Sequence, residues 1–99
     1  MSKRPPRTRK QHVKSPAEAA FLVALGQRIR ALREEKYSQE EFAHLIDVFR
    51  THMSTIERGK TDIKATTLYR IAEVLEIELS ELLRFHTSVP EQPSADDKF

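Results

Sequence analysis

The chain has 99 residues, of which 38% are apolar and none is cysteine, and its net charge is +2. A chain of this length forms one small domain, and without cysteine it has no disulfide and no cysteine-bound metal. Its longest apolar run, residues 19–25, is far shorter than the roughly 20 residues of a membrane-spanning helix, and the basic start is not followed by a cleavage site. Composition therefore predicts a soluble, cytoplasmic protein with no membrane segment.

The positive charge is concentrated at the N-terminus. Residues 1–14 carry six basic residues and no acidic one, whereas residues 15–84 and residues 85–99 each have a net charge of −2. The first segment also has two consecutive prolines and almost no apolar residues, so we expect it to be a basic disordered arm. Such an arm binds phosphates or a minor groove, or it merely keeps the chain in solution. Residues 86–99 are expected to form a disordered tail.

The first helix is expected to begin after Ser15. Ser15 can cap it, Pro16 suits the first helical position, and Glu18 completes a capping box. Apolar residues then recur at helical spacing, so we expect this helix to run to about Lys36. Gly26 interrupts it, and either weakens the helix or lets another backbone pack closely against it.

Two short helices follow, joined by a tight turn. Ser38 caps the first of them, with Glu41 at the capping-box position. Asp47 lies where the chain must turn sharply, and aspartate tolerates a positive φ better than most residues. The next helix is expected over about residues 50–58, and Gly59 supplies its stop.

The remaining helices complete an all-α fold. Apolar spacing predicts a helix over about residues 65–75, and Ser80 is expected to cap a short fifth helix. Alternating strand patterns and hairpin turn pairs are missing from the sequence. The prediction is therefore a compact five-helix bundle over residues 15–85.

The two short helices at residues 39–58 have the features of a helix-turn-helix. Such a unit needs a rigid helix pair, a small residue where the helices nearly touch, and side chains that reach base edges. Ala43 is the small contact residue. The angle between the helices is expected to be fixed by Phe42, Ile46, Val48, Met53 and Ile56. The exposed side of the second helix is expected to carry Arg50, Thr51, His52, Ser54 and Thr55.

Around these two helices, the chain contains five runs at a characteristic spacing: Leu25–Arg33, Ser38–Glu41, Ile56–Lys60, Leu68–Ala72 and Leu79–Leu82. With these runs the chain resembles, over about residues 25–84, the Cro/phage-repressor family of the xenobiotic-response-element type. The run Arg50–Ser54 followed by Ile56–Gly59 is also similar to controller proteins of restriction–modification operons. The resemblance implies a five-helix DNA-binding domain of the phage-repressor type.

The resemblance further implies which residues contact double-stranded DNA. Base edges would be contacted by Arg50, Thr51 and Thr55. The sugar-phosphate backbone would be contacted by Gln39, His52, Arg58 and Lys60. Within the first set, Arg50 suits a guanine and Thr51 suits a thymine methyl group.

Four positions carry structural expectations. Arg33 and Glu57 match a family pair that forms a salt bridge between the first helix and the end of the third. Phe49 stands where a serine or threonine normally caps the third helix, and so forgoes a cap worth about 1 kcal/mol. Asp47 would partly replace that cap, while the Phe49 ring would stack against Phe42 or lie against the sugar-phosphate backbone.

A single DNA-reading helix contacts only a few base pairs, so a homodimer is expected. The candidate interface near the C-terminus consists of Ile77, Leu79, Leu82, Leu83 and Phe85. A second apolar set in the first helix consists of Phe21, Leu22 and Val23. The alternative is that Phe21 and Leu82 simply close the core of the monomer.

The leading hypothesis is a sequence-specific transcriptional regulator that binds a roughly palindromic operator as a homodimer. The first alternative is a protein-interaction module such as an antitoxin, in which the tail folds onto a partner protein and DNA binding is secondary. The second is a nonspecific nucleic-acid binder led by the basic arm. Four scattered histidines lack ligand spacing, and no nucleophile–base pair or phosphate loop occurs, so neither a metal, a cofactor nor an enzyme is predicted.

Overall fold

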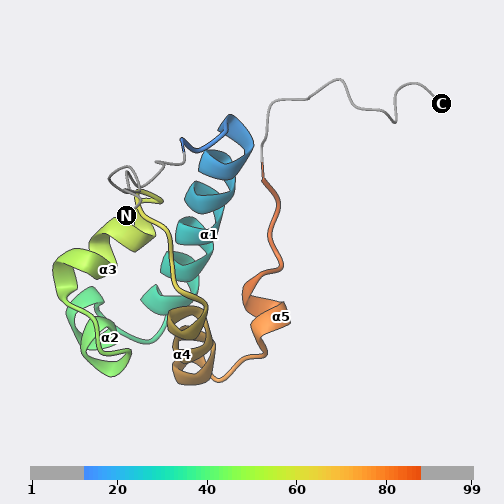
Figure 1. Ribbon diagram of the computed structural model, residues 1–99. Coiled ribbons are helices and arrows are strands. Elements are labelled where there is room, and N and C mark those ends of the chain that lie inside the picture. Colours follow the sequence, from blue (N-terminus) through green and yellow to red (C-terminus); the bar gives the residue numbers. More distant parts are fainter. Residues whose placement is uncertain (1–12, 88–99) are drawn as a thin grey trace, which may run out of the picture.

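The computed structural model describes residues 13–87, which form five helices and no strand (Figure 1). The helices are α1 (Pro16–Glu34), α2 (Gln39–Leu45), α3 (Arg50–Glu57), α4 (Ala65–Leu75) and α5 (Leu79–Leu82). The expected all-α, five-helix fold is confirmed, and α1 ends slightly before the boundary expected at about Lys36. Most of the expected arm and tail lie outside the described residues. No helix among residues 13–87 is both long enough and apolar enough to cross a membrane.

α1 is the central element of the bundle. It contacts α2, α3 and α4, and α3 also packs against α2. In Figure 1, α2 and α3 lie on one side of α1 and α5 lies on the other. The guanidinium of Arg28 on α1 donates to the backbone oxygen of Glu81 at 2.7 Å and to its carboxylate at 3.2 Å. This pair of bonds fixes α5 against α1.

The capping boxes expected at the first two helices are confirmed. The amides of Glu18 and Glu41 donate to the hydroxyl oxygens of Ser15 and Ser38, each at 3.0 Å. In return, the two serine amides donate to the glutamate carboxylates, each at 2.8 Å. Because each box satisfies two backbone N–H groups that the helix itself cannot pair, both helices begin where the sequence predicts.

The cap expected at Ser80 is wrong. α5 begins two residues earlier than a cap at Ser80 would place it, at Leu79, and Glu78 is its N-cap residue, with an extended backbone (φ −72°, ψ 149°). The carbonyl oxygen of Glu78 accepts the amide of Glu81 at 2.9 Å, so Ser80 already lies inside the helical turn. α4 ends at Leu75, and its C-cap residue Glu76 has a left-handed backbone (φ 60°), so the chain turns only three residues before α5 begins.

The core draws side chains from every helix. Its largest members, each less than 2% exposed, are Leu25, Ile29, Phe42, Ile46, Met53, Ile56, Ile71 and Leu82. Ala43 is 2% exposed, and its small side chain lies in the same cluster as the apolar residues of α2 and α3. The helix pair is therefore held rigidly by packing, as the sequence pattern predicts.

Gly26 and Gly59 allow α1 and α3 to approach closely. A Cβ atom at Gly26 would lie 2.5 Å from the backbone oxygen of Ile56 and 2.6 Å from that of Glu57. Gly59, directly after α3, has φ +72°, and a Cβ atom there would lie 2.5 Å from the Cα of Val23. Of the two readings of Gly26, close backbone packing is the one that the structure supports.

Candidate nucleic-acid interface

Hydrogen bonds to two backbone oxygens at the end of α2 fix the turn between α2 and α3. Asp47 has φ 61°, the left-handed conformation expected at this position. The amide of Val48 donates to the oxygen of Ala43 at 3.0 Å, and the guanidinium of Arg70 on α4 donates to the oxygen of Ile46 at 2.9 Å. Because these bonds satisfy carbonyl groups at the end of α2, both α2 and α4 hold the start of α3 in place.

A buried ion pair holds the end of α3 against α1. The guanidinium of Arg33 donates to both carboxylate oxygens of Glu57, from Nε at 2.7 Å and from Nη2 at 2.8 Å. The two side chains are only 8% and 3% exposed. The hydrogen bond to Glu57 raises the pKa of Arg33, against the opposing effect of burial, so the guanidinium stays charged. The salt bridge expected between these residues is present.

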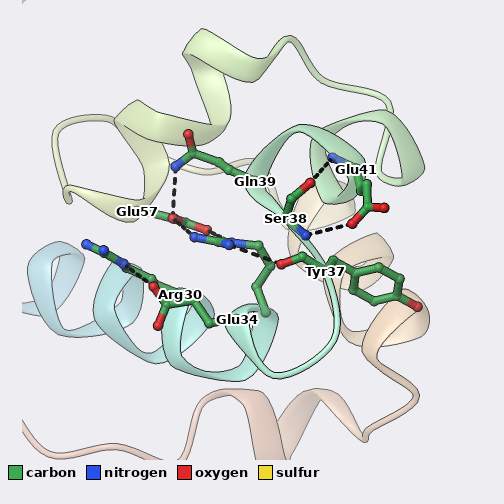
Figure 2. A network of polar contacts seen from close by, with 8 residues as sticks. Arg30, Glu34, Tyr37, Ser38, Gln39, Glu41 and Glu57 are labelled. Atoms are coloured by element: carbon green, nitrogen blue, oxygen red, sulfur yellow. Dashed lines mark hydrogen bonds and ion pairs between the residues drawn. The ribbon is translucent and has the colours of Figure 1, made fainter.

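Gln39, the first residue of α2, joins this ion pair (Figure 2). Its amide nitrogen donates to Oε1 of Glu57 at 3.0 Å. Arg33 also donates to the backbone oxygen of Tyr37 at 3.2 Å, so one buried network connects α1, α2 and α3. The contact between Gln39 and Glu57 was not expected from the sequence. It uses one of the two amide hydrogens of Gln39 and leaves the other available to a phosphate.

α3 has two faces of different character. Its buried face consists of Met53, Ile56 and Glu57. Thr51, Thr55 and Arg58 are three or four positions apart, so they lie on one helical face opposite the core. Thr51 and Arg58 are exposed, whereas Thr55 is half-buried and its hydroxyl donates to the carbonyl oxygen of Thr51 at 2.9 Å. The outer face of α3 is therefore polar and open to solvent.

Phe49 is the N-cap residue of α3, and its side chain is 82% exposed. Two expectations for this position are wrong. No side-chain hydrogen bond caps α3 within the described residues, so Asp47 does not replace the missing cap. Nor does the ring stack against Phe42, because Phe42 is fully buried and its ring lies 5.6 Å from that of Tyr37.

Cations surround the outer face of α3. Arg50, Arg58 and Lys60 are all exposed, as is His52. Within residues 13–87, none of these four side chains forms an ion pair with a carboxylate. The charges of Arg50, Arg58 and Lys60 are therefore available to an anionic ligand, although the domain as a whole is slightly acidic.

Sequence reasoning missed Lys64 as a member of this surface. Lys64 is the exposed N-cap residue of α4, and together with His52 and Arg70 it lines an open hollow of about 390 Å³ beside the start of α3. Asp47 and Asp62 line the same hollow. The sequence did contain a signal for Lys64, because this lysine stands directly before the helix expected at about residues 65–75.

The residues expected at a dimer interface divide into two groups. Leu82 is fully buried, and Ile77 and Phe85 are half-buried against the core. Leu82 was therefore wrong as an interface residue, because it closes the core of the protomer. Leu79 and Leu83 remain 38% and 39% exposed.

α1 contributes to the exposed apolar surface near α5. Phe21 and Val23 are 43% and 41% exposed, whereas Leu22 is buried. The rings of Phe21 and Phe85 are 5.6 Å apart, which brings this part of α1 next to the segment after α5. Leu79 begins α5 and Leu83 directly follows it, and we call the four exposed apolar residues Phe21, Val23, Leu79 and Leu83 together the apolar patch.

Comparison with known families, sequences and structures points in each case to helix-turn-helix proteins. The family model HTH_3, a helix-turn-helix family, matches residues 29–82, which is more than half of the chain. The control protein C.MunI from a Mycoplasma species is 44% identical over 62 residues, or 61% of this chain and 84% of that protein. The structure of the restriction–modification controller protein C.AhdI from Aeromonas hydrophila has 38% identity and a TM-score of 0.61, covering 64% of this chain and 97% of that one.

SinR, a regulator of biofilm formation solved in complex with DNA, has 36% identity and a TM-score of 0.56, covering 60% of this chain and 97% of that one. The family match includes all of α2, α3 and α4, and thus the complete helix-turn-helix. Members of this family are DNA-binding regulators rather than enzymes. The chain belongs to the HTH_3 helix-turn-helix family, and restriction–modification controller proteins are among its relatives.

Proposed function

We propose that this protein is a sequence-specific transcriptional regulator that binds a roughly palindromic operator as a homodimer, with α3 in the major groove. The observation that carries the proposal is the contrast between the two faces of α3. Its inner face is locked by the core and by the pair of Arg33 and Glu57, whereas its outer face is polar and flanked by cations that form no ion pair within residues 13–87. A helix held in this way enters a groove without rearranging.

Base reading is assigned to the start and the outer face of α3. The exposed guanidinium of Arg50 suits the two acceptors of a guanine, and the methyl group of Thr51 suits a thymine methyl. Thr55 lies one turn further along the same face, and its hydroxyl oxygen retains acceptor capacity after donating to Thr51. These three residues would read sequence only if the rest of the domain set their depth in the groove.

Backbone contacts would set that depth. His52, Arg58 and Lys60 carry donors on the exposed rim of α3, and Lys64 adds a further cation at the start of α4. Gln39 would contribute its remaining amide hydrogen at the N-terminus of α2, with its orientation fixed by Glu57. Phosphate contacts of this kind position a protein on DNA without reading sequence.

Dimerisation would follow from the apolar patch. Two copies related by a two-fold axis would bury the same patch on each other, since such interfaces are self-complementary. The two α3 helices would then need to be about 34–36 Å apart along the duplex, which requires half-sites about one helical turn apart.

Selection from a random duplex library tests the proposal. The full chain is incubated with the library at about 150 mM salt, and the enriched DNA is sequenced and titrated against a shuffled duplex and the DNA upstream of its own gene. We expect inverted half-sites separated by about 10 base pairs, and an affinity at least about 10³-fold above that for the shuffled duplex. If no sequence is enriched, the proposal fails. Equal affinity for every duplex would instead support the nonspecific binder.

A further inference from the structure

Phe49 is the most exposed aromatic side chain among residues 13–87, at 82%. Its position is unusual for an apolar ring. The N-cap residues of the other four helices are all polar: Ser15, Ser38, Lys64 and Glu78. Phe49 neither caps α3 nor joins an aromatic pair within the described residues. The ring therefore gives the free protein neither a cap nor a buried contact.

The backbone beneath the ring is firmly held. The carbonyl oxygen of Phe49 accepts the amide of Met53 at 2.9 Å, and Met53 is fully buried in the core. The preceding residue, Val48, donates its amide to Ala43 at 3.0 Å and is itself half-buried. The ring thus projects from a fixed point at the tip of α3, rather than from a loop that folds it onto the surface.

The surroundings of the ring suit DNA better than an apolar protein partner. Arg50 follows Phe49 directly, and the hollow that Phe49 lines is polar, since it contains Lys64 and Arg70 as well as Asp47 and Asp62. α3, which Phe49 precedes, lies on the opposite side of α1 from α5, which carries part of the apolar patch (Figure 1). Phe49 lies at the start of α3, and the N-terminal residues of a DNA-reading helix are the ones that contact base edges in the major groove.

We propose that Phe49 is a specificity-determining residue that places its ring against the methyl group of a thymine in the major groove. This inference rests on the proposed function, because it requires the tip of α3 to enter that groove. The thymine methyl is the one apolar group that the major-groove edges of the bases present, and a phenyl ring is among the side chains suited to it. The sequence thus replaces a helix cap with a base contact.

Two substitutions separate the base contact from the cap. Phe49→Ser and Phe49→Ala both remove the ring, but only serine can accept a hydrogen bond from the first turn of α3. We expect Phe49→Ser to unfold at a higher temperature than Phe49→Ala, while both bind the operator more weakly than the wild type, by about tenfold per half-site. The probe is the duplex that the wild-type chain selects most strongly from the random library.

The methyl group is then removed from the DNA side. Each thymine of the selected duplex is replaced by uracil in turn, in both half-sites together. We expect one position at which uracil weakens wild-type binding by about fourfold per half-site, as the loss of one buried methyl group predicts. At that position Phe49→Ala should bind the thymine and uracil duplexes equally. Tyr69→Ala, which removes a 60% exposed ring from α4, serves as the control and should retain the wild-type response to uracil.

Each contrary result has its own meaning. If no uracil substitution affects the wild type more than Phe49→Ala, the thymine contact is refuted. A loss in Phe49→Ala that is equal for the selected and shuffled duplexes would place the ring against the sugar-phosphate backbone and would also refute it. A selected operator that both Phe49 variants bind as tightly as the wild type overturns this inference alone, whereas failure of the wild type to select any sequence overturns the proposed function.

Discussion

The carboxylate of Glu57 accepts hydrogen bonds from Arg33 at 2.7 and 2.8 Å, although both side chains are more than nine-tenths buried. Burial removes the hydration of both charges, so each depends on the other for its stability. The pair joins α1 to the last residue of α3, and Gln39 extends the link to α2. The orientation of α3 therefore depends on two buried charges as well as on apolar packing.

Removing one member of this pair should destabilise the fold strongly. Arg33→Met keeps most of the side-chain volume but leaves the Glu57 carboxylate buried with only Gln39 as a side-chain donor. We expect the free energy of unfolding, measured by urea denaturation, to fall by about 3–5 kcal/mol. Adding Glu57→Leu should recover much of this loss, because no charge then remains buried. Arg30→Met, on the exposed side of the same helix, is the control, and an equal loss in that variant would contradict the prediction.

The exposed pair of Arg30 and Glu34 predicts a small pH dependence. The hydrogen bond from Arg30, at 2.8 Å, lowers the pKa of Glu34. A carboxyl group whose pKa is lower in the folded state adds stability above its unfolded pKa, and this stability is lost as the pH falls through the folded pKa. The unfolding midpoints of the wild type and Arg30→Ala should therefore differ slightly at neutral pH and converge in acid. A difference that is unchanged at about pH 2 would have another cause.

Gly26→Ala tests the close approach of α1 and α3. Alanine favours a helix interior over glycine by about 1 kcal/mol, so propensity alone predicts a more stable protein. The added methyl group would instead lie 2.5 Å from the backbone oxygen of Ile56, which cannot move aside without shifting α3. We expect a net loss of about 1–3 kcal/mol in the free energy of unfolding. Gln27→Ala, at the exposed neighbouring position, should change it little, and a stabilised Gly26→Ala would show that the helices separate easily.

The features that could be predicted from the sequence are those that depend on neighbouring residues. The boxes at Ser15 and Ser38 and the left-handed Asp47 are fixed within a few residues of chain. Leu82 and Leu83 look alike in the sequence, and only the packing of α5 decides that one is buried and the other exposed. Which of two neighbouring leucines is buried therefore cannot be predicted from the residues around them.

The candidate site was likewise predicted only in part. The resemblance predicted that Arg33 pairs with Glu57, and the structure shows this ion pair. It gave no indication that Gln39 would bind the same carboxylate, since that contact depends on the angle at which α2 meets α3. The exposure of Phe49 was likewise undecided, because a phenylalanine at a helix cap packs inward or outward according to the space beside it.

Arg50→Ala and Lys60→Ala should weaken DNA binding in different ways. Arg50→Ala removes a bidentate guanine contact, so it should cost about 1–3 kcal/mol of binding free energy and relax the base preference at one position of each half-site. Lys60→Ala removes a phosphate contact, so it should weaken binding to the selected and shuffled duplexes alike. The slope of log affinity against log salt concentration should become shallower by about 0.9 per contact. Titrations of both variants over a range of salt concentrations measure these effects. Identical behaviour of the two variants would refute the division into base-reading and backbone-binding residues.

Leu83→Asp should separate association from folding. Leu83 is 39% exposed on the apolar patch, so an aspartate there stays hydrated in the monomer but would be buried in a dimer. We expect this variant to sediment as a monomer at concentrations where the wild type is dimeric and to bind the paired half-sites much more weakly. Its unfolding midpoint should match that of the wild type at concentrations where both are monomeric. Leu82→Ala should show the opposite pattern, losing about 2–5 kcal/mol of stability because its side chain is in the core.

Leu45→Asp provides the matched control for association. Leu45 is 47% exposed on α2, away from the apolar patch, so the same change there should leave the dimer intact. If Leu83→Asp remains dimeric, the interface lies elsewhere on the molecule. If the wild type is monomeric by itself and dimerises only on the selected duplex, the apolar patch contributes to cooperative binding, and Leu83→Asp should then lower the affinity for paired half-sites but not for one half-site.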